Sequence, residues 1–221
     1  MSKGKVIVLE GLDGCGKSTQ LSLAENFLAD SSVDFRTVSF PNYSSDSGRI
    51  VSGYLSGEIP CEGAQGAYAA SSFYAVDRYI TYATDWGKDY LRGSVILSGR
   101  YTTSNAIYQM TKLPAEERES YLNWLWDYEY KKLGLPEPDA VIFLDMTLDV
   151  SQKLLTKRYG GDDSKKDIHE ANLGFMQKCR ENALFTAERC GWKTVSCAEN
   201  GEPLPVEVIA EKIRALILGV L

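Results

Sequence analysis

Histidine is almost absent from this sequence, since His169 is the single one among 221 residues. Catalysis by a histidine dyad or triad is therefore nearly excluded. Cysteine is scarce as well, and the five cysteines are scattered, odd in number and without the spacing of metal ligands. We interpret them as free thiols of a protein in a reducing cytoplasm. They are Cys15, Cys61, Cys179, Cys190 and Cys197.

The sequence also lacks a long apolar run and an excess of basic residues. No run approaches the about 20 apolar residues that a membrane-spanning helix needs. Residues 1–5 lead straight into an apolar stretch, which leaves no room for a signal peptide. The net charge of −6, from 24 Lys and Arg against 30 Asp and Glu, argues against a general nucleic-acid binder. With no internal repeat and no low-complexity linker, we expect a single cytoplasmic domain over residues 1–221.

A phosphate-binding loop lies close to the start of the chain. Residues 11–18, GLDGCGKS, fit the pattern G-x-x-x-x-G-K-[ST]; an apolar run precedes them and apolar residues at helical spacing follow. Glycines in such a loop let successive backbone N–H groups face an anion, Lys17 can reach the β- and γ-phosphates of ATP, and Ser18 can hold Mg²⁺. The residues that we expect to bind ATP are Gly11, Leu12, Asp13, Gly14, Cys15, Gly16, Lys17, Ser18 and Thr19.

Apolar runs typical of strands alternate with helical stretches along the whole chain. The expected strands are residues 5–9, 35–39, 95–98, 140–145 and 193–197. The expected helices are residues 18–30, 48–56, 64–91, 115–133, 148–157, 168–190 and 205–218. This alternation predicts an α/β, P-loop NTPase-type fold of three layers, with a central five-stranded parallel sheet and helices on both faces. Ligands of such sheets bind at the carboxyl ends of the strands.

A phosphate-binding loop alone does not name a reaction, because ATPases, GTPases and kinases share it. The N-K-x-D stretch with which GTPases bind their base is absent here. Three other stretches combine aromatic rings with Arg, Ser and Asn: FPNYSSDSG at 40–48, FYAVDRY at 73–79 and SGRYTTSNAIYQ at 98–109. Rings can stack on a base, arginine can clamp a phosphate and amides can bind base edges. Each stretch alone also suits ordinary core or surface positions, but together they predict a pocket for a second nucleotide.

These motifs together resemble the thymidylate kinases of the nucleoside-monophosphate kinase group. The resemblance rests on Asp13 within the loop, Phe40-Pro41 after the second strand, Tyr74 one turn before Asp77-Arg78, and residues 99–109. It covers most of the chain and implies transfer of the γ-phosphoryl group of ATP to dTMP, with Mg²⁺, in dTTP synthesis. It also implies a homodimer whose partners are ATP and dTMP, with no polymeric nucleic acid and no membrane.

The resemblance assigns a set of residues to dTMP. They are Asp13, Phe40, Pro41, Tyr43, Phe73, Tyr74, Arg78, Arg100, Ser104, Asn105, Tyr108 and Gln109. In this set Tyr74, or Phe73 if the register is off by one, would stack on thymine. Asn105, with Ser104 near it, would contact the edge of the base.

The remaining roles concern the sugar and the phosphate of dTMP. Asp13 would accept a hydrogen bond from the sugar 3′-hydroxyl, and Arg100 would clamp the acceptor phosphate. Arg78 would hold the base or that phosphate. Tyr108 would lie where a ribose 2′-hydroxyl clashes, and Gln109 would complete the base or sugar contacts.

The sequence departs from this family at two places. Gly99 stands where the family has an acid before its arginine, and Asp145, Glu10, Asp13 or a water molecule could take the place of that acid. Asn-Tyr at 42–43 follows Phe-Pro, where family members usually carry an arginine. The departures leave two alternatives open: a kinase for another deoxynucleoside monophosphate, and a weakly active nucleotide-binding protein.

The polar stretch YGGDDSKK, residues 159–166, separates two expected helices. We expect a mobile lid at about 158–167 that closes over the phosphates and excludes water. Some members of the family that this chain resembles carry an extra cation inside the phosphate-binding loop. Residues 14 and 15 are not basic here, so the resemblance implies that the lid supplies this cation, from Arg158, Lys165 or Lys166. The expected catalytic residues are therefore Lys17, Arg100, Arg158 and Lys165.

Overall fold

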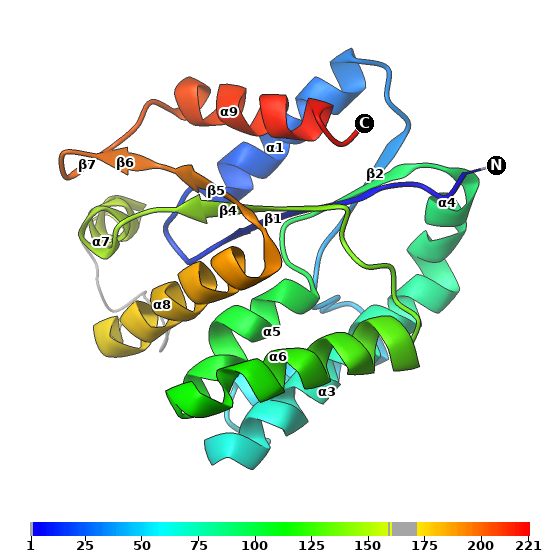
Figure 1. The fold of residues 1–221 in the computed structure, drawn as a ribbon, viewed down its shortest axis with the longest axis vertical. Coiled ribbons are helices and arrows are strands. Elements are labelled where there is room, and N and C mark those ends of the chain that lie inside the picture. Colours follow the sequence, from blue (N-terminus) through cyan, green and yellow to red (C-terminus); the bar gives the residue numbers. More distant parts are fainter. Residues whose placement is uncertain (1, 159, 161–171) are drawn as a thin grey trace.

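The computed structural model describes residues 2–158, 160 and 172–221. Their central element is a five-stranded sheet with the order β2-β3-β1-β4-β5 (Figure 1). The strands are β1 (Val6–Gly11), β2 (Phe35–Val38), β3 (Val95–Ser98), β4 (Ala140–Asp145) and β5 (Lys193–Ser196). Every neighbouring pair is parallel, which confirms the predicted sheet.

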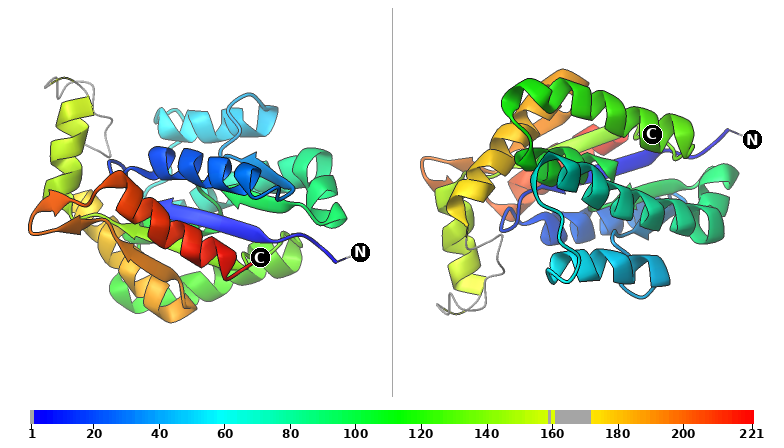
Figure 2. Two further views of the ribbon diagram at one scale, coloured as in Figure 1. Left: turned by 90° about the horizontal axis from the view of Figure 1, so that it is seen from above. Right: turned by 90° about the horizontal axis from the view of Figure 1, so that it is seen from below.

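Helices cover both faces of this sheet, as predicted. On one face α1 (Lys17–Asp30) and α9 (Val206–Leu218) lie side by side, and Figure 2 shows this pair from above. The other face carries α3 (Gly63–Thr81), α5 (Thr102–Tyr108), α6 (Arg118–Trp126) and α8 (Leu173–Cys190) (Figure 1). Three more helices are α2 (Asp46–Leu55), which packs on α3, α4 (Gly87–Arg92) before β3, and α7 (Leu148–Arg158) after β4. None of the described helices is long and apolar enough to cross a membrane.

Alternation along the central strands divides the apolar core between the two faces. Ile7 and Leu9 of β1 belong to the cluster that includes residues of α1 and α9. Val6 and Val8 belong to the opposite cluster, together with Trp86. All residues of β1 and of β3 are buried, as expected for parallel strands that are covered on both faces. The carboxyl ends of these strands carry the loops that form the site.

Several segments differ from the expected elements. The stretch predicted as one helix over 115–133 consists of a 3₁₀ turn at Ala115–Glu117, α6, and a π-helical turn at Asp127–Lys132. The stretch predicted as one helix over 64–91 consists of α3, a π-helical turn at Tyr82–Trp86, and α4. The wider turn changes the side-chain register, and Trp86 at its end is buried with its ring against Phe40 and Tyr82. A short hairpin of β6 (Ala198–Glu199) and β7 (Glu202–Pro203), which was not expected, follows β5.

Helix α5 was not expected either. Its first turn contains Thr102, Thr103 and Ser104, which favour caps and turns over helix interiors. The buried carboxylates of Glu10 and Glu129 accept hydrogen bonds from these three hydroxyls. Tertiary contacts therefore hold a helix that local preference does not favour.

All five cysteines carry free thiols, as predicted. Burial raises the pKa of the Cys15 thiol in the phosphate-binding loop. Burial also raises the pKa of Cys197 to about 12. Neither side chain is therefore a reactive thiolate near neutral pH.

Candidate active site

The phosphate-binding loop joins β1 to α1 in the order that the sequence predicts. α1 begins at Lys17, directly after Gly16, whose φ of 83° lies in the left-handed region that favours glycine. Gly14, with a φ of 79°, uses the same freedom. The loop thus places backbone N–H groups at the start of a helix, where anions bind readily.

Lys17 is the cation of this loop. Its Nζ donates a hydrogen bond to the carbonyl oxygen of Gly11 at 2.7 Å. Burial, followed by the positive charge of Arg100, lowers the pKa of Lys17. Bound phosphates would offset this lowering by their negative charge, and so the site favours an anionic ligand.

A cavity of about 790 Å³ lies over the loop. The expected ATP-binding residues from Leu12 to Thr19 line it, as do side chains of α7 and the segment 203–206 after the hairpin. This last segment was not expected at the site, because the hairpin before it was not predicted from the sequence. The available signal was ENGEPLP, residues 199–205, which is rich in turn-forming residues.

A second cavity, of about 200 Å³, is called the acceptor cavity here. The predicted dTMP-binding residues that line it are Asp13, Phe40, Pro41, Tyr43, Tyr74, Arg78, Arg100, Ser104, Asn105, Tyr108 and Gln109. Phe73, the alternative to Tyr74, is not among the described residues that line it. The fold therefore brings three distant stretches of sequence together, while the roles of their side chains in binding stay predictions.

Five residues line the acceptor cavity without having been predicted: Tyr54, Leu55, Tyr101, Lys112 and Phe175. The ring of Tyr54 stands edge-on to that of Tyr74, with 6.3 Å between the centroids. The Tyr54 hydroxyl donates to Oε1 of Gln109 at 3.1 Å and accepts from Nζ of Lys112 at 3.0 Å. Because α2 and the turn after α5 supply these groups, no local motif marks them in the sequence.

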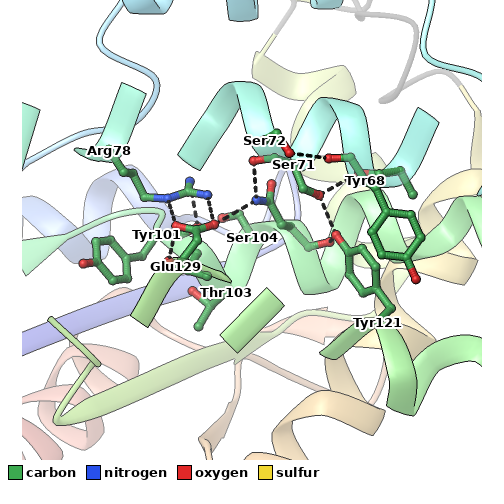
Figure 3. Close-up of polar contacts among 12 residues, drawn as sticks. Tyr68, Ser71, Ser72, Arg78, Tyr101, Thr103, Ser104, Tyr121 and Glu129 are labelled. Atoms are coloured by element: carbon green, nitrogen blue, oxygen red, sulfur yellow. Dashed lines mark hydrogen bonds and ion pairs between the residues drawn. The ribbon is translucent and has the colours of Figure 1, made fainter. Parts of the chain in front are cut away.

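Arg78 and Glu129 form a buried ion pair at the acceptor cavity (Figure 3). Nε and Nη2 of Arg78 donate to the two carboxylate oxygens at 2.7 and 2.6 Å. Burial acts to lower the pKa of Arg78, but the charge and hydrogen bonds of Glu129 outweigh it and raise this pKa. Nη1 makes a weaker contact of 3.4 Å with the carbonyl oxygen of Tyr101. Most of the Arg78 guanidinium, predicted to contact dTMP, is thus already engaged by a protein carboxylate.

Arg100 and Asp13 form the contact between the two cavities. Nη2 of Arg100 donates to Oδ1 of Asp13 at 2.7 Å. The Tyr108 hydroxyl donates to Oδ2 of Asp13 at 3.3 Å, and its ring lies 5.0 Å from the Arg100 guanidinium carbon. Burial acts to lower the pKa of Arg100, but Tyr108, Asp13 and Glu10 outweigh it, and this pKa lies well above its ordinary value. Arg100 is therefore a permanent cation beside the phosphate-binding loop.

Asp77 holds the segment after β2 against α3. One of its carboxylate oxygens accepts from the backbone N–H of Asn42 at 2.8 Å, and the other accepts from the hydroxyl of Ser47 at 2.7 Å. The Phe40–Pro41 peptide bond, just before this segment, is cis. These contacts fix one wall of the acceptor cavity.

The carboxylates near the site differ in how far they are engaged. Asp145, considered as a substitute for the acid at position 99, accepts from Nε and Nη2 of Arg180 at 2.8 and 2.9 Å.

Among the described residues, no group of three or more His, Cys, Asp or Glu side chains could hold a metal ion. A metal ion at the loop would have phosphate oxygens, water and the Ser18 hydroxyl as ligands, a set that suits Mg²⁺.

The predicted lid at 158–167 lies outside the described residues except for Arg158 and Gly160. Lys165, Lys166 and His169 also lie outside them, and their roles stay predictions. Arg158 ends α7 and lines the cavity over the phosphate-binding loop. This position puts its positive charge on the cavity that the phosphate-binding loop lines.

Comparisons with known proteins find relatives of this chain in sequence and in fold. A family model described as thymidylate kinase matches residues 9–213. The thymidylate kinase of Plasmodium falciparum is 29% identical over 209 residues, which cover 95% of this chain and 90% of that protein. The thymidylate kinase of Mycobacterium tuberculosis is 28% identical over 176 residues, covering 78% and 81%. The solved structure of thymidylate kinase from Candida albicans, 21% identical, matches 99% of this chain and 93% of that chain with a TM-score of 0.72 and shows the same fold.

Proposed function

The chain belongs to the thymidylate kinase family and phosphorylates dTMP; we propose that the γ-phosphoryl group passes from ATP on the phosphate-binding loop to dTMP in the acceptor cavity. One observation carries this placement: Asp13 lines both cavities. Transfer needs the attacking oxygen about 3–3.5 Å from phosphorus. Two cavities that share a side chain can hold the γ-phosphate of ATP and the phosphate of dTMP at this short distance.

On the donor side, Lys17 and the N–H groups of the loop bind the β- and γ-phosphates. Lys17 exchanges its hydrogen bond with the Gly11 carbonyl for one with a phosphate oxygen. Arg158, on the same cavity, adds positive charge where negative charge spreads over the transferring oxygens. Mg²⁺, with the Ser18 hydroxyl as its protein ligand, would neutralise further charge on these phosphates.

On the acceptor side, Arg100 clamps the phosphate of dTMP. Its guanidinium turns from Asp13 toward that phosphate and stays over the Tyr108 ring. A phosphate oxygen of dTMP then forms a bond to the γ-phosphorus as the bond between this phosphorus and the bridging oxygen of ADP breaks. The attacking oxygen is already anionic, so the chemistry requires no general base.

Thymine and deoxyribose are recognised by other residues that line the acceptor cavity. Tyr74 supplies a ring that remains neutral, because burial raises the pKa of its hydroxyl. The amide nitrogen of Asn105 lies 3.4 Å from both the Ser71 carbonyl and a Glu129 oxygen. This orientation leaves the amide oxygen of Asn105 to accept from N3–H of thymine. Tyr108 occupies the space that a ribose 2′-hydroxyl would need.

The test is ADP release with ATP and Mg²⁺ against dTMP, dUMP, dCMP, dGMP and AMP. We expect the highest kcat/KM with dTMP, and a loss of turnover with every acceptor in Lys17→Ala. Calorimetric titration of dTMP into Lys17→Ala is the matched control, because the acceptor cavity is unchanged there. A higher kcat/KM with another monophosphate would refute the assignment of the acceptor.

We also propose that the chain works as a homodimer in the cytoplasm. Val76, Tyr79 and Ile80 are exposed apolar side chains on α3, a surface that a second copy would cover. The free thiols suit a reducing compartment. Light scattering should give the mass of two 24.5 kDa chains, and a monomeric mass at micromolar concentration would contradict the dimer.

A further inference from the structure

Glu10 is buried at the end of β1, immediately before the phosphate-binding loop. Its Oε1 accepts hydrogen bonds from the hydroxyls of Thr103 and Ser104 at 2.7 Å each. The backbone N–H of Tyr101 adds a longer contact of 3.4 Å. Its Oε2, also buried, has no hydrogen-bond partner among the described residues. One oxygen of this carboxylate is thus saturated and the other is unused.

Glu129, on the other side of the first turn of α5, is a buried carboxylate with a structural role, and it differs from Glu10 in its partners. Both of its oxygens accept from Arg78, and Thr102 adds a hydrogen bond of 2.8 Å. Among the described residues, no arginine forms an ion pair with Glu10. A buried carboxylate with an unpaired oxygen destabilises a fold unless positive charge lies near it.

The positive charges near Glu10 belong to Lys17 and Arg100, the two cations proposed to bind the reacting phosphates. Burial lowers the pKa of Lys17 and acts to lower that of Arg100, and Glu10 is among the negative groups that act in the opposite direction on both. One of these cations belongs to the donor side and the other to the acceptor side. The Glu10 carboxylate therefore interacts electrostatically with both halves of the site.

We propose that Glu10 is the carboxylate that positions Arg100 for the acceptor phosphate. Its Oε1 accepts hydrogen bonds from Tyr101, Thr103 and Ser104, which follow Arg100 in the chain. These contacts hold the start of α5 against β1, the strand that precedes the phosphate-binding loop. Gly99, directly before Arg100, has no side chain with which to do this. The other candidate carboxylates are engaged, Asp145 by Arg180 and Asp13 by Arg100 itself. The inference rests on the proposed function.

The variant Glu10→Gln tests this role, because it keeps the size of the side chain and removes its charge. We expect kcat with dTMP to fall about 100-fold, since a displaced arginine no longer holds the attacking oxygen in line. Binding of dTMP in the absence of ATP, measured by calorimetry, should weaken about tenfold. The KM for ATP should change less than the affinity for dTMP, because the Glu10 carboxylate accepts hydrogen bonds from residues beside Arg100 and from none of the described residues of the phosphate-binding loop.

The second variant supplies a carboxylate at position 99, directly after β3. A Cβ built at Gly99 meets Cδ2 of Leu21 at 3.1 Å, the end of a flexible side chain, and so an aspartate fits there after a small shift. In the Glu10→Gln background, Gly99→Asp should recover about tenfold of the lost kcat, whereas in the wild type it should give no gain. A purely structural role of Glu10 in packing would not be restored from position 99.

The outcomes separate the two proposals. If the wild type does not phosphorylate dTMP, the proposed function itself is wrong. If the wild type is active and Glu10→Gln stays within about threefold of its kcat, the positioning role is overturned. If Glu10→Gln does not fold, Thr103→Val takes its place, because it removes one donor to Oε1 and leaves the charge. We expect Thr103→Val to lower kcat about 3- to 10-fold at unchanged KM for ATP, and an unchanged kcat overturns the role.

Discussion

Two arginine–carboxylate pairs stand at the acceptor cavity, and they differ in nearly every physical respect. Arg78 and Glu129 share two short hydrogen bonds, and their side chains are 1% and 0% exposed. Arg100 and Asp13 share one hydrogen bond of 2.7 Å, and their side chains are 28% and 26% exposed. The first pair belongs to the framework of the cavity, and the second is accessible to a ligand.

The difference follows from the elements that carry each pair. Arg78 lies in α3 and Glu129 in the π-helical turn at Asp127–Lys132, so both partners come from packed helical segments. Arg100 and Asp13 lie in loops at the carboxyl ends of β3 and β1, where parallel sheets bind their ligands. Water cannot replace a partner lost from the buried pair, but it can replace one lost from the partly exposed pair. Substitutions at the first pair should therefore change stability, and substitutions at the second should change turnover.

The largest effect is expected for Arg78→Met. The substitution leaves the Glu129 carboxylate buried and without its cation, and the free energy of unfolding should fall by about 3–5 kcal/mol. Urea denaturation, followed by circular dichroism, measures this change. A loss below about 1 kcal/mol would mean that the pair does not support the fold.

The matched variant is Arg78→Met combined with Glu129→Gln. Removal of the unpaired charge should restore part of the lost stability, because a glutamine oxygen can still accept from Thr102. The double variant separates the effect of a stranded charge from the effect of lost packing. No recovery at all would assign the whole loss to packing.

The second largest effect is expected for Arg100→Met, and it concerns turnover. Loss of the cation that clamps the acceptor phosphate should lower kcat/KM for dTMP by about 10²–10³-fold. The free energy of unfolding should change by less than about 1 kcal/mol. Arg100→Lys should recover part of the activity, because it restores the charge but not the bidentate fork. A stability loss as large as that of Arg78→Met would remove the distinction between the two pairs.

The two pairs also show how far the sequence predicts the site. The motif GLDGCGKS and the buried apolar runs are local patterns, and they predict the phosphate-binding loop, the parallel sheet and the position of Arg100 after β3. Glu129 could not be predicted as the partner of Arg78, because 51 residues separate them and no local pattern links them. The sequence therefore identified the arginine but could not show that its guanidinium is already paired.

The far wall of the acceptor cavity was missed for a related reason. Tyr54 and Lys112 are 58 residues apart and meet because α2 packs on α3, and α3 also packs on the turn after α5. Helix α5 itself contradicts the local preference of its Thr and Ser residues and depends on two buried carboxylates. Contacts of this kind arise from tertiary packing, which the spacing of residues along one element does not encode.

A smaller effect is expected for Lys112→Met, which tests whether this missed wall belongs to the ligand site. Lys112 donates to the Tyr54 hydroxyl beside the ring of Tyr74, far along the chain from the phosphate-binding loop. A hydrogen bond from a charged donor contributes about 1.5 kcal/mol. Its loss should raise the KM for dTMP about tenfold and leave kcat nearly unchanged. Tyr54→Phe is the matched control and should have a weaker effect in the same direction. A fall in kcat at constant KM would place Lys112 in the chemistry instead.

The smallest effect is expected for Tyr108→Phe, which tests the surroundings of the partly exposed pair of Arg100 and Asp13. The substitution removes the hydroxyl that donates to Asp13 at 3.3 Å but keeps the ring that lies 5.0 Å from the Arg100 guanidinium carbon. A lost neutral donor is worth about 0.5–1.5 kcal/mol, so kcat/KM for dTMP should fall about 2- to 10-fold.

Comparison of dUMP with UMP in Tyr108→Phe and Tyr108→Ala then separates the two parts of the side chain. Because the ring fills the space beside the sugar, the preference for the deoxy form should persist in Tyr108→Phe and shrink in Tyr108→Ala. Equal loss of the preference in both variants would show that the hydroxyl on Asp13, and not the ring, excludes the ribose.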